Sequence, residues 1–316
     1  MKKTILFVSS LVLTISMTTG FVLSRFTRNM QSRMNTKDLP EHGLVIIKSS
    51  DPDFDSMTAV WLQGVTSDEI ETLKPLSFFI KNTGSRTVVA HAIVSECIQA
   101  DGQRKSYRMT HANSEALTDP EEYFSALSRT NLDKTIKPGA ARLFSLIPLP
   151  STFMNAGGAG SGLLNTQTEQ GVTRETKAET LQSSLQSLAG CTDITVSIDG
   201  VFFDDGTFVG PDTTGFFENM KAQVEAKLAL RRDIAKKLKT GKSKDEIFKD
   251  IEDKANPKPS APNLAKESNP AAYHDFFSRF FAMQILRYRK LYGEDHALDK
   301  AQGPKNRPEP VLRKLK

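Results

Sequence analysis

Short apolar runs separated by polar turns dominate the middle of the chain. Runs rich in Val, Ile, Thr and Phe predict β-strands, and they fall at residues 44–48, 59–65, 76–81, 87–100, 105–109, 142–147, 194–203 and 207–209. The run 87–100 is apolar on both faces in its first half, which indicates a central strand. The run 59–65 contains the only tryptophan, Trp61. This pattern predicts a domain built mainly of strands.

Turn residues join several of these runs as antiparallel hairpins. Asp101-Gly102 and Asp205-Gly206 favour tight turns, because glycine accepts a positive φ. Residues 82–85 (NTGS) predict a further hairpin between the runs on either side of them. Because no long helical pattern lies between the runs, we expect an immunoglobulin-like antiparallel β-sandwich over residues 44–212.

Two segments interrupt the strand pattern. Residues 110–135 are polar, with a short helix predicted at 120–127. Residues 152–190 include a small-residue run at 156–162 (AGGAGSG), which is flexible by composition. We interpret 152–190 as an insertion between two strands of one sandwich, since loop entropy grows slowly with length.

After residue 212 the pattern changes to helical spacing. Apolar positions predict a helix over 216–238, and a capping box of Ser243 and Glu246 opens a second helix over 244–254. Asn269-Pro270 opens a third, aromatic-rich helix over 271–292. Its aromatic stripe has three possible docking surfaces, namely the sandwich, the earlier helices or a partner.

The N-terminal pattern predicts export. Lys2 and Lys3 precede an uncharged apolar run over residues 4–23. Thr18 and Gly20 are candidate small residues before a cleavage site, but a helix over this run would be about 30 Å long, enough to anchor the chain in a bilayer. A cleaved signal peptide and a membrane anchor both remain open. In either case we expect the bulk of the chain outside the cytoplasm, as a periplasmic, membrane-anchored or secreted protein.

These segments predict the following organisation. A signal peptide or membrane anchor occupies residues 1–23, a polar linker 24–43, the sandwich 44–212, helices 213–255, a Pro-rich linker 256–268, the aromatic-rich helix 269–293 and a basic disordered tail 294–316.

Charge is unevenly distributed around the formal net charge of +5. Residues 1–37 carry +6, residues 38–215 carry −10 and residues 216–316 carry +9. An acidic middle and a basic tail can attract each other within one molecule. No nucleic-acid-binding signature accompanies the basic block, so nucleic acid is not an expected partner. With 38% hydrophobic residues, the composition excludes a multi-spanning membrane protein.

Two cysteines, Cys97 and Cys191, lie in or beside predicted strands. In an oxidising compartment they can form a disulfide. The alternative is a pair of buried free thiols.

The acidic segment 199–212 is the main candidate for chemistry. Asp199, Asp204, Asp205 and Asp212 are weak candidates for calcium ligands, because carboxylates on tight loops suit that ion. Their spacing does not match an EF-hand, and turn formation by Asp and Gly is the favoured interpretation. No phosphate-binding loop, nucleophile elbow or metal-ligand spacing of His and Cys is present, so no catalytic residue or cofactor is expected.

Residues 194–226 (ITVSIDGVFFDDGTFVGPDTTGFFENMKAQVEA) and 78–102 (FFIKNTGSRTVVAHAIVSECIQADG) resemble a group of uncharacterised exported bacterial proteins. In that group an immunoglobulin-like sandwich ends in a DGTxVGPD-type hairpin followed by a helix. The resemblance covers residues 44–238 and implies this fold, but no activity or cofactor. No Trp follows Cys97 at the place expected of an antibody-type domain.

We therefore expect an exported, non-catalytic binding or structural protein of the bacterial envelope. Its expected partner is another envelope protein, bound by a sheet edge or by the helical tail, with membrane contact through an uncleaved N-terminal segment. The alternative is a calcium-dependent carbohydrate-binding module or a secreted hydrolase that uses the acidic hairpin. A spacer that holds the helices away from the membrane is a third hypothesis.

Overall fold

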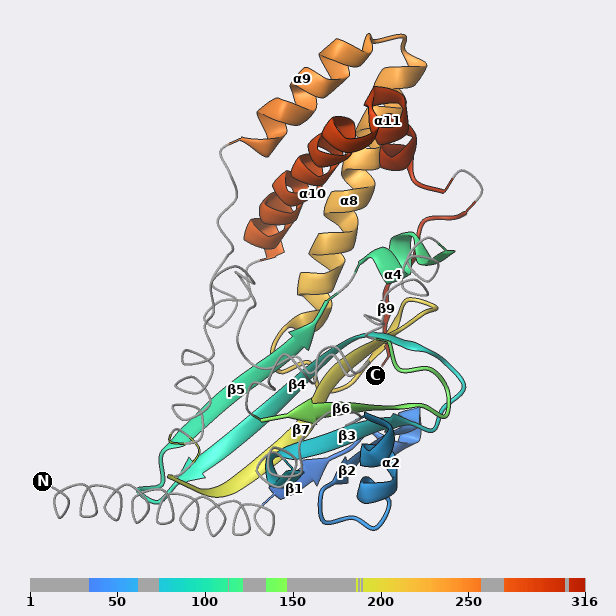
Figure 1. Ribbon diagram of the computed structural model, residues 1–316. Coiled ribbons are helices and arrows are strands. Elements are labelled where there is room, and N and C mark those ends of the chain that lie inside the picture. The colour runs from blue at the N-terminus through green and yellow to red at the C-terminus, as the bar shows by residue number, and fades with distance from the viewer. Residues whose placement is uncertain are drawn as a thin grey trace, which may run out of the picture. The chain divides into compact units, whose positions relative to one another are not determined.

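The computed structural model describes residues 34–61, 74–112, 114–121, 135–146, 186, 188, 190–256, 270–304 and 307–315 (Figure 1). The signal peptide or anchor predicted at 1–23 lies outside these residues, as do almost all of the insertion at 152–190 and of the linker at 256–268. Among the helices of this described part, none is both long and apolar enough to cross a membrane.

The chain divides into two compact units that interleave along the sequence. Of the described residues, the first unit holds those up to 85 and those within 93–110 and 131–198, and the second holds those within 86–92, 111–130 and 199–315. The two longest strands, β4 (Val88–Gln99) and β7 (Cys191–Phe203), contribute residues to both units. Neither unit is therefore a continuous stretch of sequence.

A three-stranded antiparallel sheet belongs to the first unit. Its strands are β2 (Leu44–Lys48), β3 (Ser77–Asn82) and β6 (Ala141–Ser145), with β3 in the centre. Successive residues of β3 are buried, as a strand covered on both faces requires. The three strands predicted here are confirmed. The one-turn helices η1 (Pro40–His42) and η2 (Lys74–Leu76) precede β2 and β3.

Helix α2 (Phe54–Trp61) packs on this small sheet. Phe54 meets the Phe79 ring edge-on, with ring centroids 5.1 Å apart. Thr58, one turn later, is also buried and donates a hydrogen bond of 2.7 Å to the Phe54 carbonyl oxygen. The strand predicted at 59–65 is wrong over residues 59–61, because the helical repeat that buries Phe54 and Thr58 continues through them.

The hairpin predicted at residues 82–85 does not form, because β3 and β4 belong to different sheets. The buried Asn82 amide donates to the Ile136 carbonyl oxygen (2.9 Å) and accepts from the Gly84 N–H (3.0 Å). The Asn82 backbone N–H donates to the Ala140 carbonyl oxygen (2.9 Å). These bonds tie the end of β3 to residues that precede β6, so the chain leaves the small sheet before β4 begins.

The larger sheet has the strand order β5–β4–β7–β8–β9, and a further strand, β1 (Met34–Lys37), pairs in parallel with β7. In this sheet β5 covers Arg104–His111, β8 covers Thr207–Val209 and β9 covers Arg313–Lys314. Gly102 and Gly206, in the turns after β4 and β7, both have a φ of +81°. The two predicted glycine turns are confirmed, since a positive φ costs glycine little.

The immunoglobulin-like antiparallel β-sandwich expected over residues 44–212 is wrong. The described strands form two open sheets, and β1 and β9 pair in parallel with their neighbours. The described helices hold more residues than the strands, so the architecture is mixed α/β. The apolar runs specify where strands form but not which strands pair. The apolar residues of β4, β7 and β8 that a second sheet would cover in a sandwich are covered by helix α8 (Phe216–Lys239).

The three helices predicted after residue 212 are confirmed as α8, α9 (Lys244–Ala255) and α10 (Pro270–Tyr292). Helix α8 ends at a glycine in the left-handed region, Gly241, whose φ is +77°. The capping box of Ser243 and Glu246 opens α9. The local signals therefore fix where these helices begin and end.

The prediction of a disordered tail over residues 294–316 is wrong. Helix α11 (Glu294–Gln302) buries Ala297, Leu298 and Ala301 among the helices α8, α9 and α10, and β9 extends the larger sheet (Figure 1). Few apolar residues mark α11, so its burial depends on the helices it packs against. In the sequence, the charged residues of α11 conceal the helical spacing of its three buried apolar residues.

Gly200 of β7 lies directly against the aromatic core of the second unit. A Cβ there would overlap the Phe208 ring, which is held 4.9 Å from the Phe202 ring between centroids. We expect Gly200→Ala to lower the free energy of unfolding by about 1–3 kcal/mol through overpacking, as measured by urea denaturation. Gly190→Ala is the control, because among the described residues its Cβ would meet the end of a flexible glutamine side chain, Gln99, at 3.3 Å. Equal losses in the two variants would contradict the explanation.

Candidate functional site

The acidic segment between β7 and α8 is organised around a buried carboxylate, that of Asp199. One carboxylate oxygen accepts from the N–H and hydroxyl of Thr213, at 2.8 and 2.6 Å. The other accepts from the N–H and hydroxyl of Thr214, at 3.1 and 2.5 Å. A buried carboxylate requires such partners, because its loss of water is otherwise costly. Asp199 therefore fastens the loop before α8 to β7.

Asp212 is the second anchor of this loop. Its Oδ1 accepts from the Phe217 N–H at 3.0 Å in the first turn of α8, where a negative charge is favourable. Its Oδ2 accepts from Lys314 Nζ at 2.6 Å, although the Asp212 side chain is only 5% exposed. Asp212 thus connects the start of α8 with the C-terminal strand.

Asp204 and Asp205 lie elsewhere, in the turn between β7 and β8. Asp205 Oδ1 accepts from the N–H and the hydroxyl of Thr207, at 2.9 and 2.6 Å. Arg86 donates to the same hydroxyl and places its guanidinium carbon 3.8 Å from the Phe203 ring centroid. Burial acts to raise the pKa of Asp205, but the hydrogen bonds from Thr207 and Arg86 outweigh burial and lower that pKa.

The four calcium candidates therefore occupy two separate places. Asp199 and Asp212 hold the start of α8, and Asp204 and Asp205 form a hairpin turn. Within the part of the chain that the structure describes, no three His, Cys, Asp or Glu residues are grouped so as to hold a metal ion. The donors that surround Asp199 and Asp212 in the described structure belong to the protein itself, so these two carboxylates act on the start of α8.

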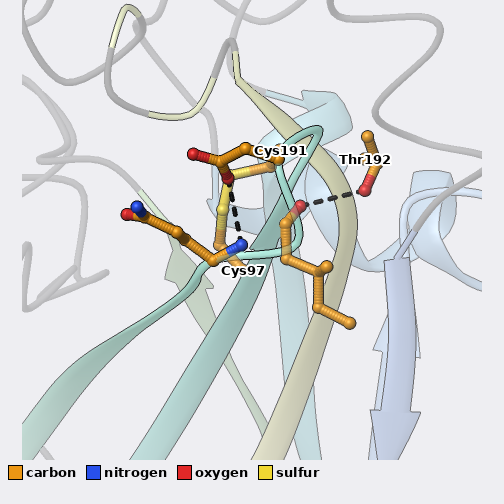
Figure 2. Close-up of a disulfide and its surroundings, with 6 residues drawn as sticks. Cys97, Cys191 and Thr192 are labelled. Carbon is orange, nitrogen blue, oxygen red and sulfur yellow. Dashed lines mark hydrogen bonds between the residues drawn. A yellow bond between two sulfur atoms is a disulfide. The ribbon is translucent and has the colours of Figure 1, made fainter.

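The structure joins Cys97 of β4 to Cys191 of β7 by a disulfide, with Cα atoms 5.5 Å apart (Figure 2). Both cysteines are 1% exposed. The hydroxyl of Thr192 donates to the Ile98 carbonyl oxygen beside the bridge, at 3.0 Å. The bridge closes a loop of 94 residues, so it removes much conformational freedom from the unfolded chain.

A second cluster of charges ties the short helix α4 (Glu115–Thr118) to α8. Lys227 Nζ lies 2.8 Å from Asp119 Oδ2 and 3.8 Å from a Glu115 oxygen, and Arg231 donates to Asp119 Oδ1. Asp119 and both cations are nearly buried, at 10–13% side-chain exposure. Burial acts to raise the pKa of Asp119, but Lys227 and Arg231 outweigh burial and hold that pKa below its usual value.

Sequence reasoning missed this cluster. Lys227 and Arg231 are visible as cations one helical turn apart, but 112 residues separate Asp119 from Arg231. Most of the short helix predicted at 120–127 lies outside the described residues, and the described helix α4 begins before it. No local pattern therefore indicates which carboxylate the two cations share.

Helix α10 presents one buried and one exposed face. Phe281, Ala282 and Ile285 are buried with α8, α9 and α11, so the aromatic-rich helix docks on its neighbouring helices. The large hydrophobic side chains that are exposed in the described part of the chain are Phe280, Leu291, Tyr292, Val311 and Leu315. All of them follow residue 279. Phe280 lies in the middle of α10, and Leu291 and Tyr292 are its last two residues.

A cavity of about 250 Å³ lies between the first halves of α8 and α10. Its lining includes the charged side chains of Glu218, Lys221 and Glu225, together with His274. Lys221 and Glu225 lie 4.0 Å apart as an ion pair along α8. The cavity is therefore lined by mixed charges that neutralise one another in part.

We expect loss of the disulfide to lower the free energy of unfolding by about 3–5 kcal/mol, because the long loop gains freedom in the unfolded state. Cys97→Ala, Cys191→Ala and the double variant should lose similar amounts, since each change removes the same bridge. Thermal melting with and without a reducing agent measures the effect, and the double variant is the control that should not respond. Additive losses in the two single variants would contradict this prediction.

We expect Asp119→Asn to lower the free energy of unfolding at pH 7 by about 1.5–3 kcal/mol, because two nearly buried cations lose their counter-charge. The folded pKa of Asp119 is depressed, so its contribution is present above about pH 4 and is lost as the pH falls through the folded pKa. Urea denaturation between pH 3 and pH 7 should therefore show the two proteins converging at low pH. Asp275→Asn, at an exposed ion pair with Arg279, is the control and should cost under about 0.5 kcal/mol.

Comparison with known proteins finds no family model, no curated protein and no solved structure that matches the chain. The resemblance to exported bacterial proteins with a DGTxVGPD-type hairpin therefore stays a prediction.

Proposed function

We propose that this chain is an exported, non-catalytic binding protein that recognises another envelope protein through the exposed face of α10. The observation that carries the proposal is that two exposed large hydrophobic side chains, Phe280 and Leu291, lie on one face of α10. Such side chains favour protein contacts when they gather on one face, whereas isolated ones need no explanation.

Helical geometry places two of these residues, Phe280 and Leu291, in one stripe with Phe276 and Arg287. Phe276, Phe280, Arg287 and Leu291 recur at spacings close to whole turns, so they share one face of α10. Phe280 is 38% exposed and Leu291 is 57% exposed. Phe276 stacks on Phe280, with ring centroids 6.3 Å apart, which preorganises the aromatic part of the stripe.

The charges along this stripe favour a particular partner chemistry. Arg287 and Lys290 are exposed beside Leu291, at the C-terminal half of α10. A basic, amphipathic helix binds well in an apolar groove with an acidic rim, because apolar anchors supply affinity and the charges supply orientation. We therefore propose a partner protein with such a groove.

Two further observations support export. The apolar run at 4–23 preceded by Lys2 and Lys3 is typical of an export signal. A buried disulfide between Cys97 and Cys191 is typical of proteins that mature in an oxidising compartment.

Photocrosslinking in living cells tests the binding surface. A photoreactive amino acid placed at Phe280 or at Leu291 should give a discrete crosslinked product, whereas the same residue placed at the exposed Lys249 of α9 should not. The double variant Phe280→Ala, Leu291→Ala should bind the captured partner about tenfold more weakly or worse, with an unchanged melting temperature. Unaltered binding by this variant would rule out α10 as the recognition surface.

A reporter fused to the C-terminus tests export separately. A phosphatase that is active only outside the cytoplasm should be active in the fusion, and deletion of residues 2–23 should abolish that activity. An inactive full-length fusion would contradict export without bearing on the α10 surface.

A further inference from the structure

The C-terminal segment adds a strand to the edge of the larger sheet. β9 runs parallel to β8, with Thr207 opposite Arg313 and Phe208 opposite Lys314. The Arg313 N–H donates to the Gly206 carbonyl oxygen at 3.1 Å, and the Leu315 N–H donates to the Phe208 carbonyl oxygen at 2.9 Å. Backbone pairing of this kind is how extended peptides bind the edge of a sheet.

The acceptor surface has a specific place for the Lys314 ammonium. Nζ donates to the Asp212 carboxylate at 2.6 Å and lies 5.7 and 6.0 Å from the ring centroids of Phe208 and Phe217. A carboxylate that is 5% exposed and two aromatic faces together favour a cation at this point. Asp212 is held in position because its other oxygen accepts from the Phe217 N–H.

The side chains of the segment alternate between the acceptor and solvent. Leu312 packs against the core cluster formed by β4, β7, β8, α4 and α8, two residues before Lys314. Val311 is 61% exposed and Leu315 is 42% exposed. A Cβ on Gly206 would lie 2.7 Å from the Val311 carbonyl oxygen, so the segment lies directly on this glycine. The acceptor therefore recognises Leu and Lys two residues apart on an extended strand.

The residues before β9 are held less closely. Pro304, Arg307, Pro308 and Glu309 are exposed, and the ion pair of Glu309 with Arg232 is exposed on both sides. Prolines at 304, 308 and 310 favour extended backbone and remove N–H donors. Among the described residues of the segment, those at 311–315 therefore make the contacts that hold it on the acceptor.

We propose that the edge of β8, with Asp212, Phe208 and Phe217, is a peptide-binding site for an extended Leu-x-Lys segment, and that the C-terminal segment of a second copy of this chain occupies it. Each copy carries both the ligand and the acceptor, so exchange between two copies recreates every contact described above. Reciprocal exchange of an identical element is a low-cost route to a dimer. This site is separate from the α10 surface.

Single-cysteine variants of the full chain test the exchange. Thr207→Cys and Arg313→Cys alter neighbouring positions on the paired strands, while the native cysteines are buried in their own disulfide. The two variants are mixed at equal concentration, incubated and mildly oxidised. A disulfide-linked heterodimer that increases with protein concentration supports the proposal.

A matched pair controls for random collision. Thr207→Cys mixed with Lys249→Cys, which is exposed on α9, should give little heterodimer. The double variant Thr207→Cys, Arg313→Cys should crosslink within one chain at low concentration, which shows that the thiols can react in this geometry. Crosslinking only within one chain at every concentration would overturn the exchange between copies.

A synthetic peptide of residues 307–316 tests the acceptor directly. Full-length Leu312→Ala, Lys314→Ala protein has a weakened resident segment, so it should bind the fluorescent peptide at least tenfold more tightly than the unaltered protein does. A peptide with Glu in place of Lys314 should not bind, because Asp212 would then face a like charge. Absence of binding to the variant, or equal binding of both peptides, would overturn the peptide site.

Discussion

Packing of the first residues of α8 on β7 and β8 is the constraint on which the second unit depends. The Phe217 ring is stacked on Phe202 at 5.7 Å and lies 5.4 Å from Phe208, between ring centroids. Gly200 provides the space for Phe208. Asp199 fixes the loop that delivers α8 to this surface. If this junction moved, α4, α9, α10 and α11 would lose the helix on which they pack.

The same junction explains why the acidic segment is conspicuous in the sequence. Asp199 and Asp212 direct their oxygens at protein donors around the start of α8, and Asp205 stabilises its own turn. Asp212 also receives Lys314, so one carboxylate serves both the helix and the C-terminal strand. Residues that suggest a ligand site in the sequence thus act on the fold. Of these carboxylates, only Asp212 also belongs to a proposed binding surface, the edge of β8; the other proposed surface is the exposed face of α10.

Charged residues of the second unit are found both in a nearly buried cluster and on the exposed surface. The acidic middle and basic tail predicted to attract each other do so at defined points within the second unit, where Asp119 meets Lys227 and Arg231. The nearly buried cluster resists solvent screening more than an exposed pair would. Arg287 and Lys290 remain exposed and available for a partner.

The sequence by itself determined the features that depend on neighbouring residues. The capping box of Ser243 and Glu246, the left-handed Gly241 and the glycine turns at 102 and 206 each need only a few adjacent residues, so their positions were predictable. Only the tertiary structure decided which strands pair, because apolar runs of similar composition compete for the same partners. It separated β3 from β4 through the buried Asn82, joined Asp119 to two distant cations and ordered the C-terminal strand on β8. These contacts gain their free energy from burial and charge between residues far apart in the chain. A local sequence pattern therefore does not indicate which residues form them.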